Sequence, residues 1–527
     1  MRDCLGILRR AASTALTAAM ISPAAFCDGP FRIDPAKMSK IGTVDERFQS
    51  FNIEMVEVTG GRFWAPYKSQ EVSETKKEPN LATPGIDPSL FRMRTPIDLS
   101  NSRLRKLAAA LGPTYLRVSG TWENSTYFQD SDGATPSSPP PGFGGILTRA
   151  EWRGVIDFAR VVNAKIVTSF AISDGVRDAK GVWTPDQARR FLAFTKADGA
   201  EIAAAEFFNE PSFASMGGAP KGYDAAAYVR DFGIFRRFVK DAAPGMLILG
   251  PGSIGEAAPF ALSGLSMLKT EDMLAGEGSN IDALSYHFYG ALSKRCAVMP
   301  GVAKTTPEAA LSQEWLSRTD RDFAYYAALR DRFAPGKPIW LTETGQTACG
   351  GDSWASTFID SFRYLDQLGR LAKRGVQVVA HNTLNASDYG VIDEETLTPR
   401  PNYWSAVLWR RTMGTTVLDA GASPVENVHL YAHCLRTKPG GVAVLAINLD
   451  RETAHDLSIP GQALRYTLTA SDLLGSRVEL NGRELKLGAD DAMPALTGVA
   501  VAGGRLTLPP ASITFVTLPG AGNSSCR

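Results

Sequence analysis

The chain has 527 residues, of which 44% are hydrophobic and 21% are charged, and its formal net charge is +1. This composition is typical of a globular protein long enough for two or more domains. The near-zero net charge excludes the general basic field that nucleic-acid-binding proteins use, so we expect no nucleic-acid partner. A local basic groove for an acidic polymer is still compatible with this average.

The first residues have the features of an export signal. Arg9 and Arg10 precede the small and apolar run AASTALTAAMISPAAF, which has the length of the apolar region of a signal peptide. We expect a signal peptide over residues 1–25 and an exported protein that is secreted, periplasmic or on the outer surface. The alternatives are an amphipathic first helix and lipid attachment at Cys27. No later segment has the ~18 uninterrupted apolar residues of a transmembrane helix.

Short apolar runs alternate with helix-like amphipathic segments, such as residues 147–163 and 354–375, over most of the chain. Eight apolar strands separated by helices indicate a parallel sheet with both faces covered. We therefore predict an α/β fold, a (β/α)8 TIM barrel over residues 41–412, with an open doubly wound sheet as the alternative. The predicted strands are residues 48–55, 114–120, 165–172, 202–208, 246–250, 281–289, 338–343 and 376–382.

The last part of the chain differs from the barrel region in its pattern. Residues 441–450, 464–474 and 504–520 are short β runs separated by glycine, proline and asparagine, with little helical periodicity. This pattern predicts a C-terminal β-sandwich domain over residues 413–527. Residues 26–40 include an N-terminal strand that could belong to the same sandwich.

Two acidic residues follow or end predicted barrel strands. Glu210 follows the fourth strand in EFFNEPS, and Glu343 ends the seventh in WLTETG. Strands four and seven lie on opposite sides of a closed barrel, and barrel enzymes work at the C-terminal ends of their strands. The two carboxyls can therefore face each other across the barrel mouth. The alternative is that they are unrelated acids in loops.

Two facing carboxyls are what the cleavage of a glycosidic bond requires. One must carry a proton for the leaving oxygen, and the other must be ionised. A glutamate acts as the acid near neutral pH only if its surroundings raise its pKa. Phe207 and Phe208, which precede Glu210, would raise its pKa if their rings lie near the carboxyl.

Other motifs give weaker indications. The stretch GPGSIG (250–255) matches a dinucleotide-binding fingerprint, but it follows the fifth strand and contains Pro251. We therefore predict a turn at the barrel rim and no cofactor.

The five histidines lack metal-ligand spacing, so we expect no metal. His287 and His381 could reach the barrel mouth, although hydrogen-bonded core positions are more typical of such residues.

The cysteines fit an exported protein better than a zinc protein, because no C-x-x-C spacing occurs. Cys434 could pair with Cys526, and Cys296 with Cys349, but the sequence alone does not give the connectivity. Asn124-Ser125-Thr126, Asn385-Ala386-Ser387 and Asn523-Ser524-Ser525 are glycosylation signals, each short enough to arise by chance.

An ordered set of motifs is similar to the heparanase and β-glucuronidase family, glycoside hydrolase family 79. The resemblance begins near residue 41, extends to the C-terminus and preserves the order and spacing of the family's motifs. The motifs are TYLRVSGTW, FFNEPS, LSYHFYG, TETGQTACGG, HNTLNASDYGVID, PNYWSAVLWRRTMG and LAINL.

This resemblance implies a retaining endo-β-D-glucuronidase that cleaves heparan sulfate by double displacement. An exo-acting β-glucuronidase that releases terminal glucuronic acid is the first alternative, and a non-catalytic carbohydrate-binding barrel is another. The partner is then heparan sulfate or another glucuronic-acid polysaccharide, with no cofactor. We expect a monomer.

The resemblance also implies roles for particular residues. Glu210 would be the acid/base and Glu343 the nucleophile, and Cys434 and Cys526 would form a disulfide. Neutral N–H donors would hold the uronate without adding a cation that lowers the pKa of Glu210. The residues implied in substrate binding are Asn209, Tyr289, Gly350, Gly351, Tyr389, Glu54 and Thr121. Basic loop residues that could contact sulfates are Arg177, Lys180, Lys221, Lys294 and Arg295.

Overall fold

The computed structural model describes residues 30–70, 87–257, 267–277, 280–296, 303–423 and 425–527. The predicted signal peptide and Cys27 lie outside the described residues. In the part of the chain that is described, no helix is both long and apolar enough to cross a membrane.

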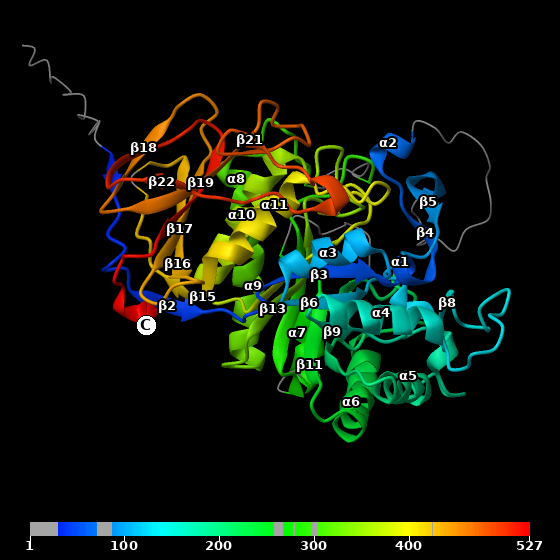
Figure 1. Ribbon diagram of the computed structural model, residues 1–527. Coiled ribbons are helices and arrows are strands. Elements are labelled where there is room, and N and C mark those ends of the chain that lie inside the picture. Colours follow the sequence, from blue (N-terminus) through cyan, green and yellow to red (C-terminus); the bar gives the residue numbers. More distant parts are fainter. Residues whose placement is uncertain (1–29, 71–86, 258–266, 278–279, 297–302, 424) are drawn as a thin grey trace, which may run out of the picture.

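Eight parallel strands close into a barrel, which confirms the predicted fold class and excludes the open sheet. The strands follow one another around the barrel in chain order, and the last pairs with the first. Figure 1 shows this barrel beside the C-terminal sheets. Its strands are β3 (Gln49–Glu54), β6 (Thr114–Ser119), β9 (Ala164–Thr168), β10 (Ile202–Ala205), β11 (Leu247–Ser253), β12 (Ala283–Tyr289), β13 (Ile339–Gly345) and β14 (Val378–His381).

Amphipathic helices cover the barrel. In α4, Thr148 and Glu151 form a capping box at the N-terminus, and Trp152, Val155 and Ile156 are buried on one face. The helices are α1 (Met55–Thr59), α2 (Tyr67–Gln70), α3 (Ser102–Leu111), α4 (Arg149–Val161), α5 (Asp186–Ala197), α6 (Ala225–Ala242), α7 (Thr270–Glu277), α8 (Gln313–Leu316), α9 (Arg318–Phe333), α10 (Phe358–Lys373) and α11 (Pro401–Thr412). Two small sheets lie outside the barrel ladder, β4 (Gly61–Trp64) with β5 (Phe91–Arg94) and β7 (Thr126–Gln129) with β8 (Gly145–Thr148).

Several strand ends differ from the prediction, and two of these differences lie beside the candidate site. The strand β10 ends at Ala205, so Phe207 and Phe208 are not part of it. The Phe207 ring stacks on Phe235 of α6 at 5.1 Å between centroids, and packing against this helix takes the chain out of the ladder. The strand β11 continues to Ser253, so residues 250–253 form strand where we predicted a turn.

Two sheets form the C-terminal sandwich. The larger includes β2 (Lys40–Thr43), β15 (Met413–Leu418), β16 (Val428–Leu435), β17 (Val442–Asn448), β24 (Ser512–Leu518), β19 (Ala463–Thr469), β20 (Glu479–Leu480), β21 (Arg483–Glu484) and β22 (Val499–Val501). The smaller contains β1 (Phe31–Arg32), β18 (His455–Ile459) and β23 (Gly504–Leu508). Val444 and Ala446 of β17 pack in the core with Leu457 of the smaller sheet.

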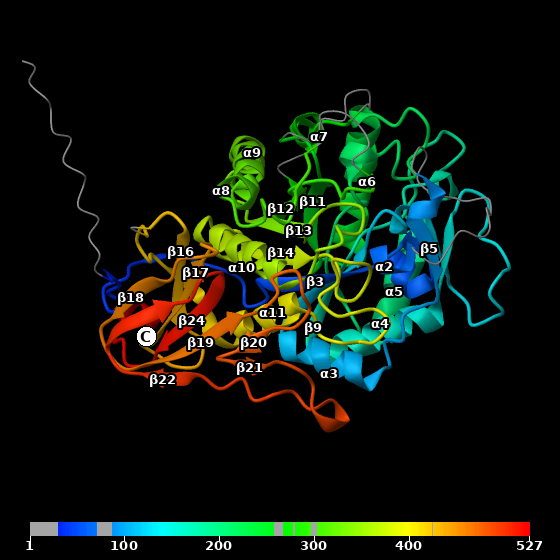
Figure 2. The same cartoon turned by 90° about the horizontal axis from the view of Figure 1, so that it is seen from above.

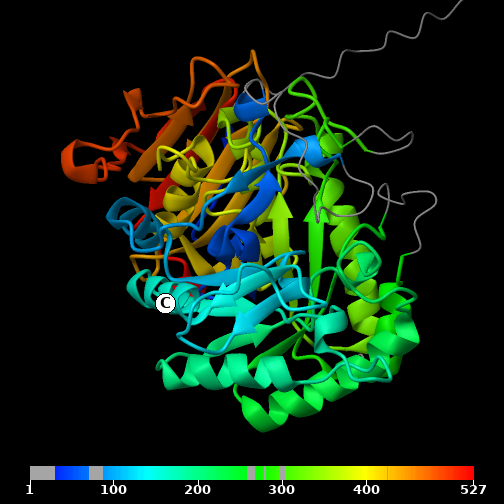
Figure 3. The same ribbon diagram turned by 90° about the vertical axis from the view of Figure 1, so that its right-hand side faces the viewer.

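The other face of the large sheet packs against the barrel helices. Leu445 and Ile447 alternate with the sandwich-core residues of β17 and belong to the same cluster as the barrel core. Figures 1 and 2 both place α10 and α11 between the barrel and the large sheet. Gly369 of α10 permits this contact, because a Cβ there would lie 2.3 Å from the Tyr431 ring. Figure 3 shows α5 and α6, drawn in teal and green, on the side away from the sandwich.

Candidate active site

The structure brings Glu210 and Glu343 together. Glu343 is the fifth residue of β13, and Glu210 follows β10 and precedes the short 3-10 helix η4 (Pro211–Phe213). One oxygen of each carboxylate and one ring nitrogen of His287 all lie within 4.8 Å of one another. The Glu343 side chain is 8% exposed and that of Glu210 is 19% exposed, so both are mostly shielded from water.

Glu210 has a left-handed backbone conformation, with φ 50° and ψ 61°. This region is unfavourable for residues other than glycine, and its use at a site is held in place by the surroundings. Phe213 donates its N–H to the Glu210 carbonyl at 2.9 Å. The conformation turns the chain sharply between the strand and the 3-10 helix and places the Glu210 side chain beside His287.

Both oxygens of Glu343 accept hydrogen bonds from buried groups. Arg117 of β6 donates from Nη1 to Oε2 at 2.9 Å, and Tyr289 of β12 donates its hydroxyl to Oε1 at 2.9 Å. A charged and a neutral donor, one directed at each oxygen, fix the orientation of this side chain. Glu343 is therefore an oriented carboxylate.

Glu206 holds the other side of the Arg117 guanidinium. Its Oε2 accepts from Arg117 Nη2 at 2.9 Å, and its Oε1 accepts from the Thr342 hydroxyl at 2.6 Å. Burial alone would raise the pKa of Glu206, but the charge of Arg117 and that of the nearby His287 hold it well below its usual value. Gly252 leaves room for this carboxylate, since a Cβ there would lie 2.8 Å from its Oε1.

Glu210 has the opposite electrostatic environment. Burial and the negative charge of Glu343 raise the pKa of Glu210 above its ordinary value. His287 Nδ1 lies 3.0 Å from Glu210 Oε1 and partly opposes this rise. Burial lowers the pKa of His287, but the charge of Glu343, the nearby Glu206 and the hydrogen bond between His287 and Glu210 raise it to about 9. A protonated His287 donates to Oε1 and leaves Oε2 of Glu210 free to carry a proton.

Replacement of Arg117 by methionine should lower the free energy of unfolding by about 3–5 kcal/mol at neutral pH, because two buried carboxylates lose their counter-ion. The stabilisation from Glu206 requires the ionised form. It is present above the ordinary pKa of 4.5 and is lost as the pH falls below that value. The deficit of Arg117→Met, measured by urea unfolding, should therefore shrink as the pH is lowered from 5 to 3.

Arg177→Met is the matched control, because Arg177 also forms a buried ion pair, with Asp231 at 2.8 Å, outside this network. Both variants should lose stability. Only Arg117→Met should lose catalytic activity at a temperature where both are folded. Equal activity losses would show that Arg117 has no special relation to Glu343.

Asn209 is held from several sides. Its Oδ1 accepts from Arg117 Nη2 at 2.7 Å, and its Nδ2 lies 3.5 Å from the Thr121 hydroxyl oxygen. The Asn124 side chain bonds to the main chain of Asn209, donating to its carbonyl at 2.9 Å and accepting from its N–H at 2.8 Å.

A second group of polar side chains surrounds Asn382, which follows β14. Its amide donates to Glu54 Oε1 at 3.0 Å, to the Tyr289 hydroxyl at 3.0 Å and to the Tyr389 hydroxyl at 3.2 Å. Burial and the nearby Glu343 raise the pKa of Glu54 well above its ordinary value. Glu54 Oε2 is buried without a hydrogen-bond partner among the described residues. A Cβ at Gly120 would lie 1.5 Å from this oxygen, so only glycine fits there.

The loop after β13 contains three successive residues with positive φ. The values are 65° at Cys349, 82° at Gly350 and 86° at Gly351. Within the described residues, the N–H groups of Gly350 and Gly351 have no hydrogen-bond acceptor. Cys349 forms a disulfide with Cys296, which connects this loop to the loop after β12. Two free N–H groups in such a concave backbone can bind an anion.

Arg295 contacts the same loop through its guanidinium. Its Nη2 donates to the Gly351 carbonyl at 3.1 Å and to Asp388 Oδ2 at 3.1 Å. Its side chain is 4% exposed. Arg295 and Arg177 are therefore buried in ion pairs and are not the solvated basic loop residues that the sequence suggested. Lys180, Lys221 and Lys294 are exposed.

Of the remaining cysteine and histidine predictions, only His287 concerns the two carboxylates. Cys434 and Cys526 form a disulfide at the end of the sandwich. His381 Nε2 lies 2.9 Å from the Tyr389 carbonyl oxygen, and burial lowers its pKa to about 4. His381 is therefore a neutral core residue, whereas His287 lies between the two carboxylates.

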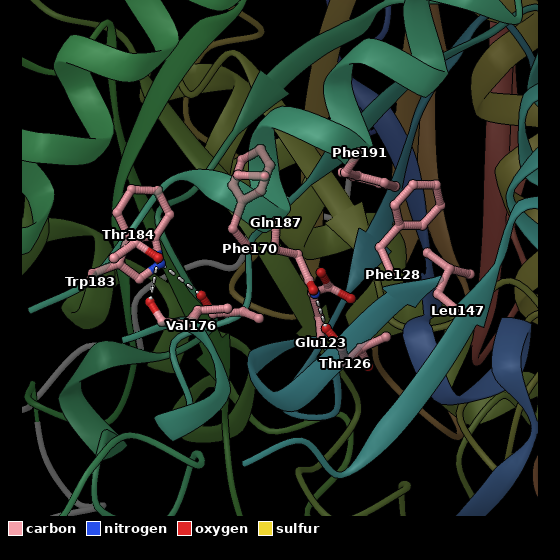
Figure 4. Close-up of a pocket in the computed structure, with 12 residues that line it drawn as sticks. Glu123, Thr126, Phe128, Leu147, Phe170, Val176, Trp183, Thr184, Gln187 and Phe191 are labelled. Atoms are coloured by element: carbon pink, nitrogen blue, oxygen red, sulfur yellow. Dashed lines mark hydrogen bonds between the residues drawn. The ribbon is translucent and has the colours of Figure 1, made fainter. Parts of the chain in front are cut away.

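The arrangement does not favour a metal ion, and a separate cavity lies outside it. The ligand atoms of Glu210, His287 and Glu343 converge, but the Arg117 guanidinium occupies one side of Glu343 and would repel a metal cation. A cavity of about 20 Å³, enough for about one water, lies near Glu123 and Gln187. Figure 4 shows the residues that line it. None of the residues that line it belongs to the group around the two carboxyls.

The comparison with protein families identifies the group to which the chain belongs. A model of the glycosyl hydrolase family 79 N-terminal domain matches residues 93–369. The chain belongs to glycosyl hydrolase family 79. This confirms the resemblance found in the sequence motifs, and the protein is a glycoside hydrolase of the heparanase and glucuronidase type.

Family 79 relatives include proteins from animals and plants. Heparanase-like protein 3 of Arabidopsis thaliana is 26% identical over 470 residues, covering 80% of this chain and 84% of that protein. Heparanase of Bos taurus is 27% identical over 507 residues, covering 85% and 88%. Baicalin-beta-D-glucuronidase of Scutellaria baicalensis is 35% identical over 190 residues, covering 34% and 36%.

Solved structures share the fold of this family 79 chain. A 4-O-α-L-rhamnosyl-β-D-glucuronidase from Fusarium oxysporum has a TM-score of 0.61 at 14% identity, covering 93% of this chain and 99% of the other. A family 51 arabinofuranosidase from Xanthomonas axonopodis pv. citri has a TM-score of 0.59 at 18% identity, with the same coverage. At these identities the likeness concerns the fold alone.

Proposed function

We propose that the protein is a retaining endo-β-D-glucuronidase that cleaves heparan sulfate by double displacement. The observation that carries the proposal is the pair of Glu210 and Glu343, with oxygens within 4.8 Å of each other and opposite electrostatic environments. Carboxyl groups stand about 5–5.5 Å apart in retaining glycosidases and about 6.5–9.5 Å apart in inverting ones. The short separation supports retention.

In this mechanism Glu343 is the nucleophile and Glu210 the acid/base. Glu343 attacks the anomeric carbon while Glu210 gives its proton to the departing oxygen, which forms a glycosyl-enzyme intermediate. The Glu210 carboxylate then takes a proton from water, which attacks the same carbon and releases Glu343. The raised pKa of Glu210 supports its role as the acid, and the hydrogen bonds from Arg117 and Tyr289, which orient the Glu343 carboxylate, support its role as the nucleophile.

The polar residues around the pair are proposed to bind the glucuronic acid. The free N–H groups of Gly350 and Gly351, with the Tyr389 hydroxyl, would hold its carboxylate. The Arg295 charge nearby is offset by Asp388. Asn209 is proposed to bind the 2-hydroxyl, Tyr289 to keep Glu343 oriented, and Glu54 and Thr121 to contact the same sugar.

The Cys296–Cys349 disulfide should support affinity for the uronate, because it holds the loop that carries the two glycines. We expect Cys296→Ser/Cys349→Ser to raise KM for an aryl β-glucuronide about tenfold, with kcat changed less than about threefold. Hydrolysis of the matching aryl β-glucoside should be unaffected. Cys434→Ser/Cys526→Ser removes the sandwich disulfide and is the control. Equal effects on both sugars would contradict the proposed carboxylate subsite.

The proposal extends to organisation and location. Residues 41–412 would form the catalytic domain, apart from β2 (Lys40–Thr43), which pairs within the large sheet of the sandwich. Residues 413–527 would form the sandwich domain, with residues 26–40 contributing the strand β1. The two disulfides support export, since such bonds persist in oxidising compartments. We also propose that the protein acts as a monomer.

Incubation with heparan sulfate and with a small aryl β-glucuronide, followed by sizing of the products, distinguishes endo from exo cleavage. Relatives named heparanase favour endo cleavage, and exposed Lys180, Lys221 and Lys294 could contact sulfates. A relative named baicalin-beta-D-glucuronidase favours the exo alternative. Falling polymer length supports endo action. Release of monosaccharide alone from the polymer would show the exo enzyme.

A further inference from the structure

The backbone at Glu210 has an unfavourable conformation, which hydrogen bonds on both sides of the residue stabilise. Glu210 has φ 50°, and no side-chain cap supports the 3-10 helix that follows it. On the C-terminal side, the Ser212 hydroxyl exchanges hydrogen bonds with the main chain of Ile254, both at 3.0 Å. On the N-terminal side, the main chain of Asn209 is held by a side chain that the sequence indicated only as part of a glycosylation signal.

That side chain is Asn124, in the short helix η2 (Glu123–Ser125) after β6. It is 0% exposed. Its Oδ1 accepts from the Asn209 N–H at 2.8 Å, and its Nδ2 donates to the Asn209 carbonyl at 2.9 Å and to the Gly217 carbonyl at 2.9 Å. The amide thus binds both polar groups of one peptide residue, as a neighbouring strand would, and continues the sheet pairing past the end of β10.

Asn124 is itself fixed on its main-chain side. Its carbonyl accepts the N–H groups of Ile172 at 2.8 Å and Ser173 at 3.1 Å, both from the loop after β9. The loops after β6, β9 and β10 therefore meet at this one asparagine. A buried amide with both ends bonded is also no acceptor for a glycan, so the Asn-Ser-Thr sequence has a structural rather than a glycosylation role.

We propose that Asn124 is a positioning residue, which directs the Glu210 carboxyl toward the leaving oxygen through the main chain of Asn209. This assignment rests on the proposed function. Asn124 touches neither Glu210 nor Glu343 through its side chain, so it acts on proton donation and not on nucleophilic attack. A misplacement of about 1 Å can reduce the rate on the order of a hundredfold.

Leaving-group dependence separates positioning from a merely structural role. A leaving group of low pKa departs without protonation, whereas phenol needs the proton from Glu210. We expect Asn124→Ala and Asn124→Asp to lower kcat/KM for phenyl β-glucuronide about a hundredfold. For 2,4-dinitrophenyl β-glucuronide the loss should stay below about threefold. Asn124→Asp keeps the size of the side chain and the acceptor for Asn209 N–H but loses the two donors.

Asn448→Ala is the matched control. Asn448 is also 0% exposed, and its amide bonds loop carbonyls in the sandwich, including that of Pro509 at 2.8 Å. It should lose stability with the same proportional change for both substrates. Losses of equal size for the two leaving groups in the Asn124 variants would overturn the assignment.

The outcome also separates this assignment from the proposed function. Wild-type protein that hydrolyses neither aryl β-glucuronide contradicts the proposed function itself, whereas active wild type with uniform losses in the variants contradicts only the role of Asn124. Asn124→Ser is the third variant, in case the alanine protein does not fold. Failure of all three to fold would overturn the assignment, because the fold rather than Glu210 would then depend on Asn124.

Discussion

Glu343→Gln should abolish hydrolysis of aryl β-glucuronides, with a loss in kcat of at least about a thousandfold. The amide keeps the size of the side chain and can still accept from Tyr289, but it cannot form the ester intermediate. It also leaves Arg117 facing a neutral group at Nη1, where it now donates to Glu343 Oε2. Steady-state kinetics with a 4-nitrophenyl substrate gives the measurement.

Glu123→Gln is the matched control for this substitution. Glu123 is also buried, and burial raises its pKa well above the ordinary value. Its side chain contacts neither Glu210 nor Glu343, so replacement by glutamine should change kcat less than about threefold. Activity of Glu343→Gln within tenfold of wild type would show that another group is the nucleophile.

Glu210→Ala should give a different kinetic pattern. We expect kcat/KM for phenyl β-glucuronide to fall about 10²–10⁴-fold, because proton donation is lost. A 2,4-dinitrophenyl substrate should still form the intermediate, which then accumulates without a base to activate water. Azide, which needs no base, should restore turnover and give the β-glucuronyl azide. Formation of the α-azide, or no response to azide, would contradict the acid/base role.

The pH dependence follows from the same residue. The pKa of Glu210 is raised in the folded protein, by burial and by Glu343. The proton that it donates is present below this raised value and is lost as the pH rises through it. Wild-type kcat/KM should therefore decline on the alkaline side, and Glu210→Ala should lack this decline.

The barrel could be predicted because its strands are almost continuous apolar runs, a pattern that parallel sheets with two covered faces produce. The ends of the strands were less predictable. Phe207 and Phe208 have the composition of a strand, yet they pack outward against α6 once β10 has ended at Ala205. The prediction of a turn at residues 250–253 was wrong, because these residues continue β11. Gly252 allows the Glu206 carboxylate to pack closely against this strand.

The candidate carboxyls could be found because they lie at the ends of strands, where the barrel fold places its site. Arg117 and Glu206 were missed, although each is a charged residue in or beside an apolar strand, which is a signal for a buried ion pair. Asn124 could not be found in this way. Its partner Asn209 lies 85 residues away, and only the folded loops bring the two together.

The configuration of the first product tests the central claim most directly. Hydrolysis of an aryl β-glucuronide followed by proton NMR from the first minutes distinguishes the two anomers before they interconvert. Double displacement by Glu343 and Glu210 predicts that β-glucuronic acid is released first and that the α-anomer appears only by later mutarotation. Release of the α-anomer first would mean a single displacement and would contradict this account of the site.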